Sequence, residues 1–280
     1  SHYSGGKANF TDANLGVNHH LDSRNSLHLN GYFATDRFSF GADTSFRYTN
    51  IIASLEFRHR GDDGNNFQIT GGYDHYFNRT GIASWEEGAY ELDTYIRQIF
   101  LRSNWNKLFG SHLVSAGLDA VGYGLDPGIL NPSGTSSKVK ARSLSREYAV
   151  EPSLYVSDNW RLAETFSLEG GIRLSSFLFV NPSKFYIGPE FRVSARYSPL
   201  PNLSFKAGFN SLRQYIHLIS NTSAISPMDT WKLSDASIKP TTGWQAAGGI
   251  YWTHLGSGID FSLEGYWKQM ANHLDYKPNR

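Results

Sequence analysis

The stretch Asn202–Asn210, NLSFKAGFN, alternates apolar with polar or small residues from its second position to its last. Successive side chains of a β-strand point to opposite faces of the sheet, whereas a helix repeats about every 3.6 residues. The stretch therefore predicts a strand with one apolar face and one polar face. The same alternation recurs at 166–173, 190–197 and 259–268.

Alternation of this kind predicts about twelve strands, which cover most of the chain. Most of them reach the roughly 9–11 residues that a tilted strand needs to cross a membrane. No low-complexity linker divides the sequence, so residues 1–280 are predicted to form a single domain. The expected strands lie near 8–20, 26–37, 48–60, 66–78, 91–105, 111–123, 145–160, 165–178, 187–198, 202–215, 240–254 and 259–273.

The connections between these strands favour a membrane barrel over a soluble sandwich, although both have an apolar and a polar face. Every first connection is short and rich in turn residues, and every second one is longer. Outer-membrane barrels have this arrangement, with tight turns at one end and long loops at the other. We therefore expect an antiparallel transmembrane β-barrel meander with almost no helix. Short connections include 22–25, 61–65, 107–110, 199–201 and 255–258, and long ones 124–143 and 216–239.

Composition excludes several other classes of protein. The net charge of +1 gives no electrostatic reason to expect a nucleic-acid partner. The absence of cysteine excludes a disulfide scaffold and thiolate metal sites. Aromatic residues make up 15% of the chain, which is typical of β-structure. No apolar run approaches the length of about 18 residues that a membrane helix needs.

Several segments, taken in order, resemble the barrel of TonB-dependent outer-membrane receptors of the Bacteroidetes type. The likeness is specific in the second half of the chain and looser in the first. The segments that carry it are IGPEFRVSARY (187–197), NLSFKA (202–207), QYIHLISNT (214–222), DTW (229–231), IKP (238–240) and NHLDY (272–276), with LNGYF (29–33) and ASLEFRH (53–59) upstream.

The resemblance implies a bacterial outer-membrane barrel of about 22 strands with an N-terminal plug domain in its lumen. It implies import of a scarce nutrient, such as a siderophore complex, cobalamin, a glycan or a peptide, with energy from the inner membrane. The implied partners are outer-membrane lipid, a small-molecule or oligomeric substrate, and the TonB complex through an N-terminal region not found in this chain. A surface lipoprotein is a further candidate partner. No cofactor and no enzymatic activity are implied.

About twelve strands are roughly half of such a barrel, and the sequence contains no plug, TonB box or barrel-closing strand. We therefore expect an internal part of the barrel. It follows that the outermost strands, Asn9–Leu21 and Ile259–His273, are predicted not to pair with each other.

The first candidate ligand-binding loop contains Trp85, Glu86 and Glu87. An aromatic ring beside two carboxylates suits a cation or a sugar. A solvated acidic loop is the alternative interpretation.

The second candidate loop, Arg213–Lys239, carries Tyr215, His217 and Trp231 together with several hydroxyl groups. Aromatic faces with polar neighbours suit sugars or peptides. The alternative is that these side chains pack the loop against the barrel.

No catalytic or metal site is predicted. His19 and His20 are adjacent, so in a strand they point to opposite faces and cannot share a metal ion. Gly61–Asn66 lacks the ligand spacing and the final glutamate of an EF-hand loop, and a tight hairpin accounts for its composition.

The polar faces of the predicted strands carry charges of both signs. In a closed soluble core these charges would be costly without partners, whereas a wet barrel lumen accommodates them. We expect Arg173, Arg196, Lys206 and Glu264 to point inward, and Leu168, Val193, Phe205, Phe209 and Leu263 to point toward lipid. The full set of expected inward charges is Glu56, Arg58, Glu169, Arg173, Glu190, Arg192, Arg196, Glu264 and Lys268.

Three functions compete at this point. The first is the barrel part of a TonB-dependent receptor. The second is a self-contained twelve-stranded outer-membrane barrel with hydrolase activity, which would need a lipid-facing serine–histidine pair and a polar group that orients the histidine. The third is a passive pore or secretion barrel.

Overall fold

The computed structural model describes residues 6–40, 44–62, 64–83, 86–219 and 230–274. It contains fifteen β-strands and one short 3-10 helix, η1 (Glu86–Gly88). In the described part of the chain no helix is long and apolar enough to cross a membrane. The strands are β1 (Lys7–His20), β2 (Asn25–Phe40), β3 (Thr44–Arg60), β4 (Asn66–Ile82), β5 (Tyr90–Phe109), β6 (His112–Pro132), β7 (Arg142–Ser143), β8 (Glu147–Ala163), β9 (Phe166–Phe179), β10 (Lys184–Leu200), β11 (Leu203–Gln214), β12 (Ile216–Ile219), β13 (Thr230–Leu233), β14 (Thr241–His254) and β15 (Ile259–Ala271).

Twelve long strands form one antiparallel meander in the order β1-β2-β3-β4-β5-β6-β8-β9-β10-β11-β14-β15. The short β7 adds to β6, and β12 pairs with β13 as a separate hairpin. The predicted antiparallel meander is confirmed. Within the described residues β1 pairs only with β2 and β15 only with β14, so the two outermost strands are not paired with each other, as predicted.

The cross-strand register confirms the predicted division of the side chains into two faces. Val193 lies opposite Phe209, and Phe205 lies opposite both Tyr197 and Ile250. On the other face Arg196 lies opposite Lys206. Because strand side chains alternate in direction, these pairs define an apolar face and a polar face that run across the sheet.

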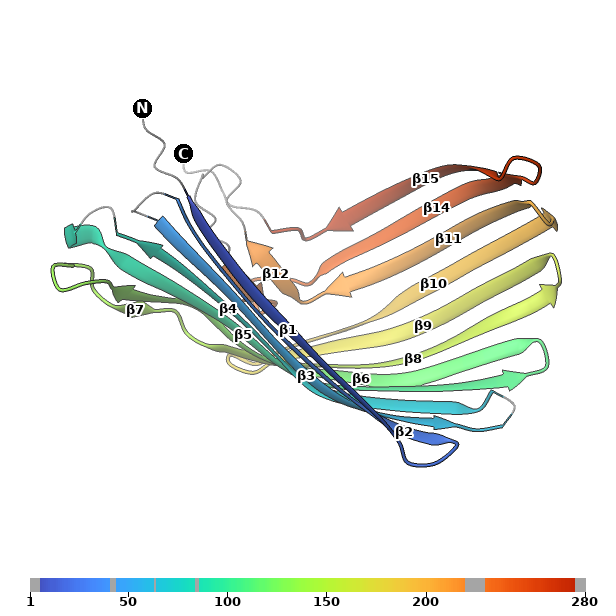
Figure 1. The fold of residues 1–280 in the computed structure, drawn as a ribbon, viewed down its shortest axis with the longest axis horizontal. Helices are drawn as coiled ribbons and strands as arrows, with labels where there is room; N and C mark the ends of the chain where they lie inside the picture. The colour runs from blue at the N-terminus through green and yellow to red at the C-terminus, as the bar shows by residue number, and fades with distance from the viewer. Residues whose placement is uncertain (1–5, 41–43, 63, 84–85, 220–229, 275–280) are drawn as a thin grey trace.

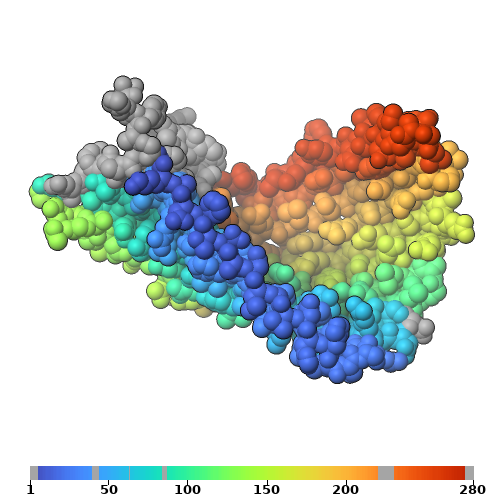
Figure 2. All heavy atoms as spheres, in the orientation of Figure 1, coloured from blue at the N-terminus to red at the C-terminus, as the bar shows by residue number. Residues whose placement is uncertain are grey.

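The polar face is the concave one. The sheet is bent into an open trough, with the first and last strands on opposite arms (Figure 1), and a space-filling view shows the hollow between them (Figure 2). Polar side chains from strands as far apart as β3 and β11 line one cavity of about 720 Å³ in this hollow. The convex face carries exposed leucine, isoleucine, valine and aromatic residues, including Leu55, Ile99, Leu154 and Leu263.

The strands are longer than the sequence indicated, and two of the predicted long connections are shorter than expected. β2 ends at Phe40 and β3 begins at Thr44, while β9 ends at Phe179 and β10 begins at Lys184. Pairing continues to these ends, because backbone groups beyond the membrane still find partners in the neighbouring strand. The strict alternation of short and long connections therefore fails at the β2–β3 connection, whereas the β9–β10 connection is still longer than the turns on either side of it.

The predicted long connection 124–143 is also partly wrong. β6 continues to Pro132, and its last residues pair with the start of β5 after a register shift near Asp93. A proline at the end of a strand removes only one donor from the ladder, so it does not break the pairing. Within this connection only 133–146 lies outside the long strands, and its Arg142–Ser143 forms β7.

Candidate functional site

The concave face carries an unbroken polar row that runs from β1 to β9. Residues placed opposite one another on successive strands run from Asn18 and His28 through Glu56, Thr70, Arg102, Asp119 and Ser153 to Ser175. Since cross-strand partners share a face, this row is a direct product of the alternation in each strand. It forms the floor of the trough.

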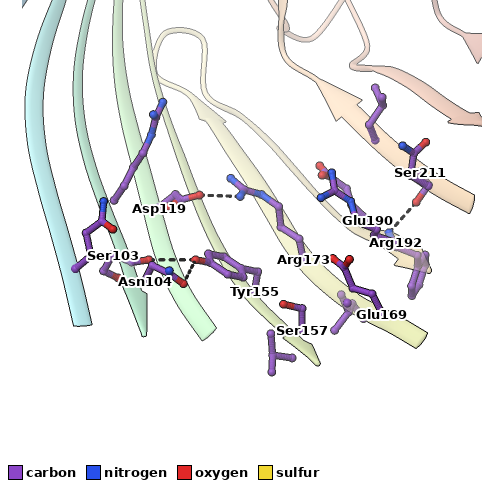
Figure 3. Close-up of a pocket in the computed structure, with 18 of the residues that line it drawn as sticks. Ser103, Asn104, Asp119, Tyr155, Ser157, Glu169, Arg173, Glu190, Arg192 and Ser211 are labelled. Carbon is purple, nitrogen blue, oxygen red and sulfur yellow. Dashed lines mark hydrogen bonds and ion pairs between the residues drawn. The ribbon is translucent and has the colours of Figure 1, made fainter. Parts of the chain in front are cut away.

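Hydrogen bonds join this row into a network. The Glu56 carboxylate accepts hydrogen bonds from Gln68 (2.5 Å) and Thr70 (3.1 Å), and it pairs with Arg58. Arg173 Nη1 donates to Asp119 Oδ2 at 2.7 Å across three strands (Figure 3). Charge-assisted hydrogen bonds of this kind hold long side chains in one geometry.

Gly117 explains how Tyr155 reaches the network. The hydroxyl of Tyr155 donates to Asn104 Oδ1 at 2.9 Å, two strands away (Figure 3). Its ring crosses β6 over Gly117, where a Cβ atom would lie 2.6 Å from the ring and 2.1 Å from the Ser103 carbonyl oxygen. A glycine inside a strand thus marks a close approach that no other residue would allow.

Part of the polar face has no internal partner. Among the described residues Glu169, Glu190 and Arg192 form no ion pair, although all three line the cavity. Asn210, which lies opposite Arg192, has a buried Oδ1 without a hydrogen-bond partner. Unpaired polar groups on a concave wall suit water or a polar body inside the trough.

A second structure, the β12–β13 hairpin, packs onto the concave wall near the long-loop end. Figure 1 shows β12 between the two arms of the trough. The hairpin contributes Leu233 to the one cluster of buried apolar residues found in the described regions, whose other members are Ile96, Leu125, Ala149, Phe177, Phe179 and Tyr215. The interior packing of this chain is therefore concentrated around the hairpin.

The buried carboxylate of Glu147 on β8 anchors the hairpin. Its Oε2 accepts a hydrogen bond from the backbone nitrogen of Leu233 at 2.9 Å, and its Oε1 pairs with Lys232. A second contact joins the Tyr186 hydroxyl to the carbonyl oxygen of Asp235 at 2.7 Å. Burial acts to lower the pKa of Lys232, but Glu147 and Asp235 together raise it, so this amine keeps its charge.

The structure brings Tyr215, His217 and Trp231 together in this hairpin region. Tyr215 is buried, with its ring stacked on Phe177 at a centroid distance of 4.8 Å. Trp231 is partly buried against the same cluster. The packing interpretation thus describes the present positions of Tyr215 and His217, and ligand contact by any of the three remains a prediction.

The other candidate loop is only partly described. Trp85 lies outside the described residues, and of Glu86 only its place in η1 is described. Glu87 is exposed and pairs with Lys138 at 2.6 Å. Its ligand-binding role also remains a prediction.

His217 gives the hairpin a pH dependence. Its ring forms hydrogen bonds with the hydroxyl groups of Ser234 (2.8 Å) and Thr241 (3.3 Å). Burial, with a smaller contribution from His273, lowers the pKa of His217 below the ordinary 6.5. A released hairpin would therefore bind a proton near pH 6.5 that the docked hairpin does not bind, so docking should weaken as the pH falls below that value.

We expect amide exchange in 216–219 and 230–233, corrected for its intrinsic pH dependence, to accelerate below about pH 6.5 and stay constant above it. The His217→Gln variant should lose this dependence. Exchange that accelerates equally in both proteins would contradict the assignment to His217.

Sequence reasoning missed Glu147, Asp119 and Gly117 as important residues. Glu147 stood at the start of a strand with nothing to show that it would meet a segment 86 residues later. Among the described residues no group of three or more histidine or acidic side chains is placed to hold a metal ion.

The open meander, with an apolar convex face and a polar concave face, defines the wall of an outer-membrane β-barrel. The chain belongs to the TonB-dependent receptor family: residues 1–280 match the family described as "TonB dependent receptor-like, beta-barrel". The predicted family and the outer-membrane location are confirmed. The Bacteroidetes subtype remains a prediction.

Solved structures of similar fold include the copper transporter OprC, the ferric preacinetobactin receptor BauA from Acinetobacter baumannii and the ferric-catecholate import receptor Fiu from Escherichia coli K12. Their TM-scores are 0.75, 0.72 and 0.70, with sequence identities of 12%, 13% and 14%. The matches cover 95%, 93% and 96% of this chain but 46%, 46% and 52% of the respective structures. The chain thus spans about half the length of these transport receptors. The comparison with curated proteins found no match.

Proposed function

We propose that this chain forms part of the barrel wall of a receptor that imports a scarce nutrient with energy supplied through TonB. The nutrient is a siderophore complex, a glycan or a peptide. The observation that carries the proposal is the polar row on the concave face, which lies behind an apolar face suited to lipid. A wall of this kind separates lipid from a wet interior.

The unpaired charges on the wall suit a polar occupant of the lumen. Glu190 and Arg192 line the cavity without forming an ion pair among the described residues. We propose that they contact a plug domain supplied by a part of the receptor outside this chain. On this proposal residues 1–280 are an internal part of the barrel.

Ligand contact is proposed for the long-loop end. Trp231 is only partly buried and offers an aromatic face beside the hairpin anchor. We include Trp85, Glu86, Glu87, Tyr215 and His217 in the proposed contact surface, with Tyr215 and His217 reached only when the hairpin leaves the wall. A surface lipoprotein that covers this end is part of the same proposal.

The test is uptake by cells that express the full-length receptor as their single copy. We expect growth on one member of a panel of ferric siderophores, glycans and peptides, and loss of that growth when TonB is deleted. Growth that persists without TonB would instead indicate a passive pore.

The hydrolase alternative gains no support from the geometry. Ser26 Oγ lies 2.9 Å from His28 Nε2, and His28 Nδ1 lies 2.5 Å from Asn18 Oδ1, which is a nucleophile–base–orienter arrangement. However, Asn18 and His28 belong to the polar row, and Ser26 is two residues from His28 on the same face, so all three face the lumen and not lipid. A hydrolase of membrane lipid would need the opposite face.

A further inference from the structure

Three arginines stand side by side on the convex face of the first strands. Arg37 on β2 lies opposite Arg47 on β3, and Arg47 lies opposite Arg79 on β4. Below the arginines, the same face carries exposed apolar side chains, including Phe33, Ile51 and Tyr73. Like charges directly opposite one another are unfavourable unless negatively charged groups compensate them.

The height of this row matches the headgroup region of a membrane. Outward positions of β4 run from Phe67 to Phe77 without a charged residue, with His75 among them. The ten steps from Phe67 to Phe77, at about 3.3 Å each and tilted by roughly 40°, span about 25 Å, the height of the apolar band of a barrel. Arg79 is the next outward residue toward the long-loop end, so the arginine row lies just above the band.

An aromatic layer supports the guanidinium groups. The ring of Phe77 has the Arg47 guanidinium 5.9 Å and the Arg79 guanidinium 5.6 Å from its centroid. Tyr95 packs against Phe77 and has Arg97 5.4 Å from its own ring. Aromatic rings at the membrane interface are typical of barrels, and here each also positions a cation.

The row retains excess positive charge. Arg79 is paired with both carboxylates nearby, Asp93 at 2.7 Å and Glu91 at 3.0 Å. Among the described residues Lys7, Arg37 and Arg47 form no ion pair, and the buried Nε of Arg47 has no hydrogen-bond partner. Lys7, Arg37, Arg47 and Arg79 line a common groove of about 750 Å³.

We propose that this groove binds the phosphate headgroup of a membrane lipid of the outer leaflet. Guanidinium groups bind phosphate through paired charge-assisted hydrogen bonds, and the groove offers Arg37 and Arg47 for this purpose. The acyl chains of the lipid then lie along the apolar side chains directly below, including Phe33, Ile51, Tyr73 and Ile99. Free phosphate would satisfy the arginines but would leave this apolar surface without a role.

The test uses the full-length receptor in detergent, titrated with phosphorylated lipid A and, separately, with its dephosphorylated form. We expect only the phosphorylated lipid to bind, and the Arg37→Gln/Arg47→Gln variant to lose about 30-fold in affinity, as expected for two interfacial cations. Lys107→Gln/Arg161→Gln is the control for the loss of two positive charges, which it removes near the short turns. It should bind lipid normally, and heat-modified gel mobility verifies that each barrel is folded.

Three results would overturn the proposal. Equal binding of both forms of the lipid would show that the phosphate is not recognised. An unchanged affinity in the Arg37→Gln/Arg47→Gln variant would show that the groove is not the site. Inorganic phosphate that binds as tightly as the lipid would show a phosphate site and not a lipid site. None of these outcomes depends on the imported nutrient.

Discussion

Replacing Glu147 by alanine is expected to release the β12–β13 hairpin from the barrel wall. The substitution removes the buried acceptor for the Leu233 nitrogen and one of the two carboxylates that pair with Lys232. Breaking one side of a buried ion pair costs about 3–5 kcal/mol. Here Asp235, 3.3 Å from Lys232, still compensates part of the remaining charge. Since the contact is only partly buried on the lysine side, the lower end of this range is expected.

The measurement is hydrogen exchange of the full-length receptor, read at 216–219 and 230–233. A cost of about 3 kcal/mol corresponds to exchange faster by about two orders of magnitude. Glu169→Ala is the matched control, since it removes an inner-face carboxylate that forms no ion pair among the described residues. Unchanged protection of the hairpin in the Glu147 variant would show that Glu147 is not the anchor.

A second large effect is expected from a comparison of two variants, each with one new arginine on β5. In one variant the arginine is on the convex face, and in the other it is on the concave face. Ile99 is 69% exposed on the convex face and lies opposite Tyr73, near the middle of the apolar band. Gln98, its neighbour, lies opposite Asp74 and Tyr123 on the concave face. Ile99→Arg should lower the free energy of unfolding in lipid vesicles by about 2–4 kcal/mol.

Gln98→Arg should cost little in the same experiment, because the new cation faces the lumen and meets the carboxylate of Asp74. Denaturant titration of the full-length receptor in vesicles compares the two variants directly. Equal losses of stability would contradict the assignment of the convex face to lipid.

The sequence predicted the features of the fold that depend on local alternation. Val193, Phe205 and Phe209 could be assigned to one face and Arg196 and Lys206 to the other, because parity within a strand needs no knowledge of its neighbours. The register then aligned these faces across strands, as the apolar pattern required.

The features that the sequence did not reveal depend on contacts between distant segments. The continuation of β6 to Pro132 requires a partner on β5 that takes up a register shift, which no local pattern encodes. The burial of Tyr215 against Phe177 likewise requires that a loop fold back over the wall. Loop residues with aromatic rings look alike in sequence whether they bind a ligand or pack against the wall.

The direct pairing of β11 with β14 bears on how such a receptor can diversify. Gln214 lies opposite Thr241, so the chain leaves the sheet and re-enters it at adjacent ladder positions. Everything between these residues can therefore be lengthened, shortened or exchanged without shifting the register of the wall, and the entropic cost grows only slowly with length. Selection can thus act on the hairpin while the scaffold inherited by the lineage stays constant.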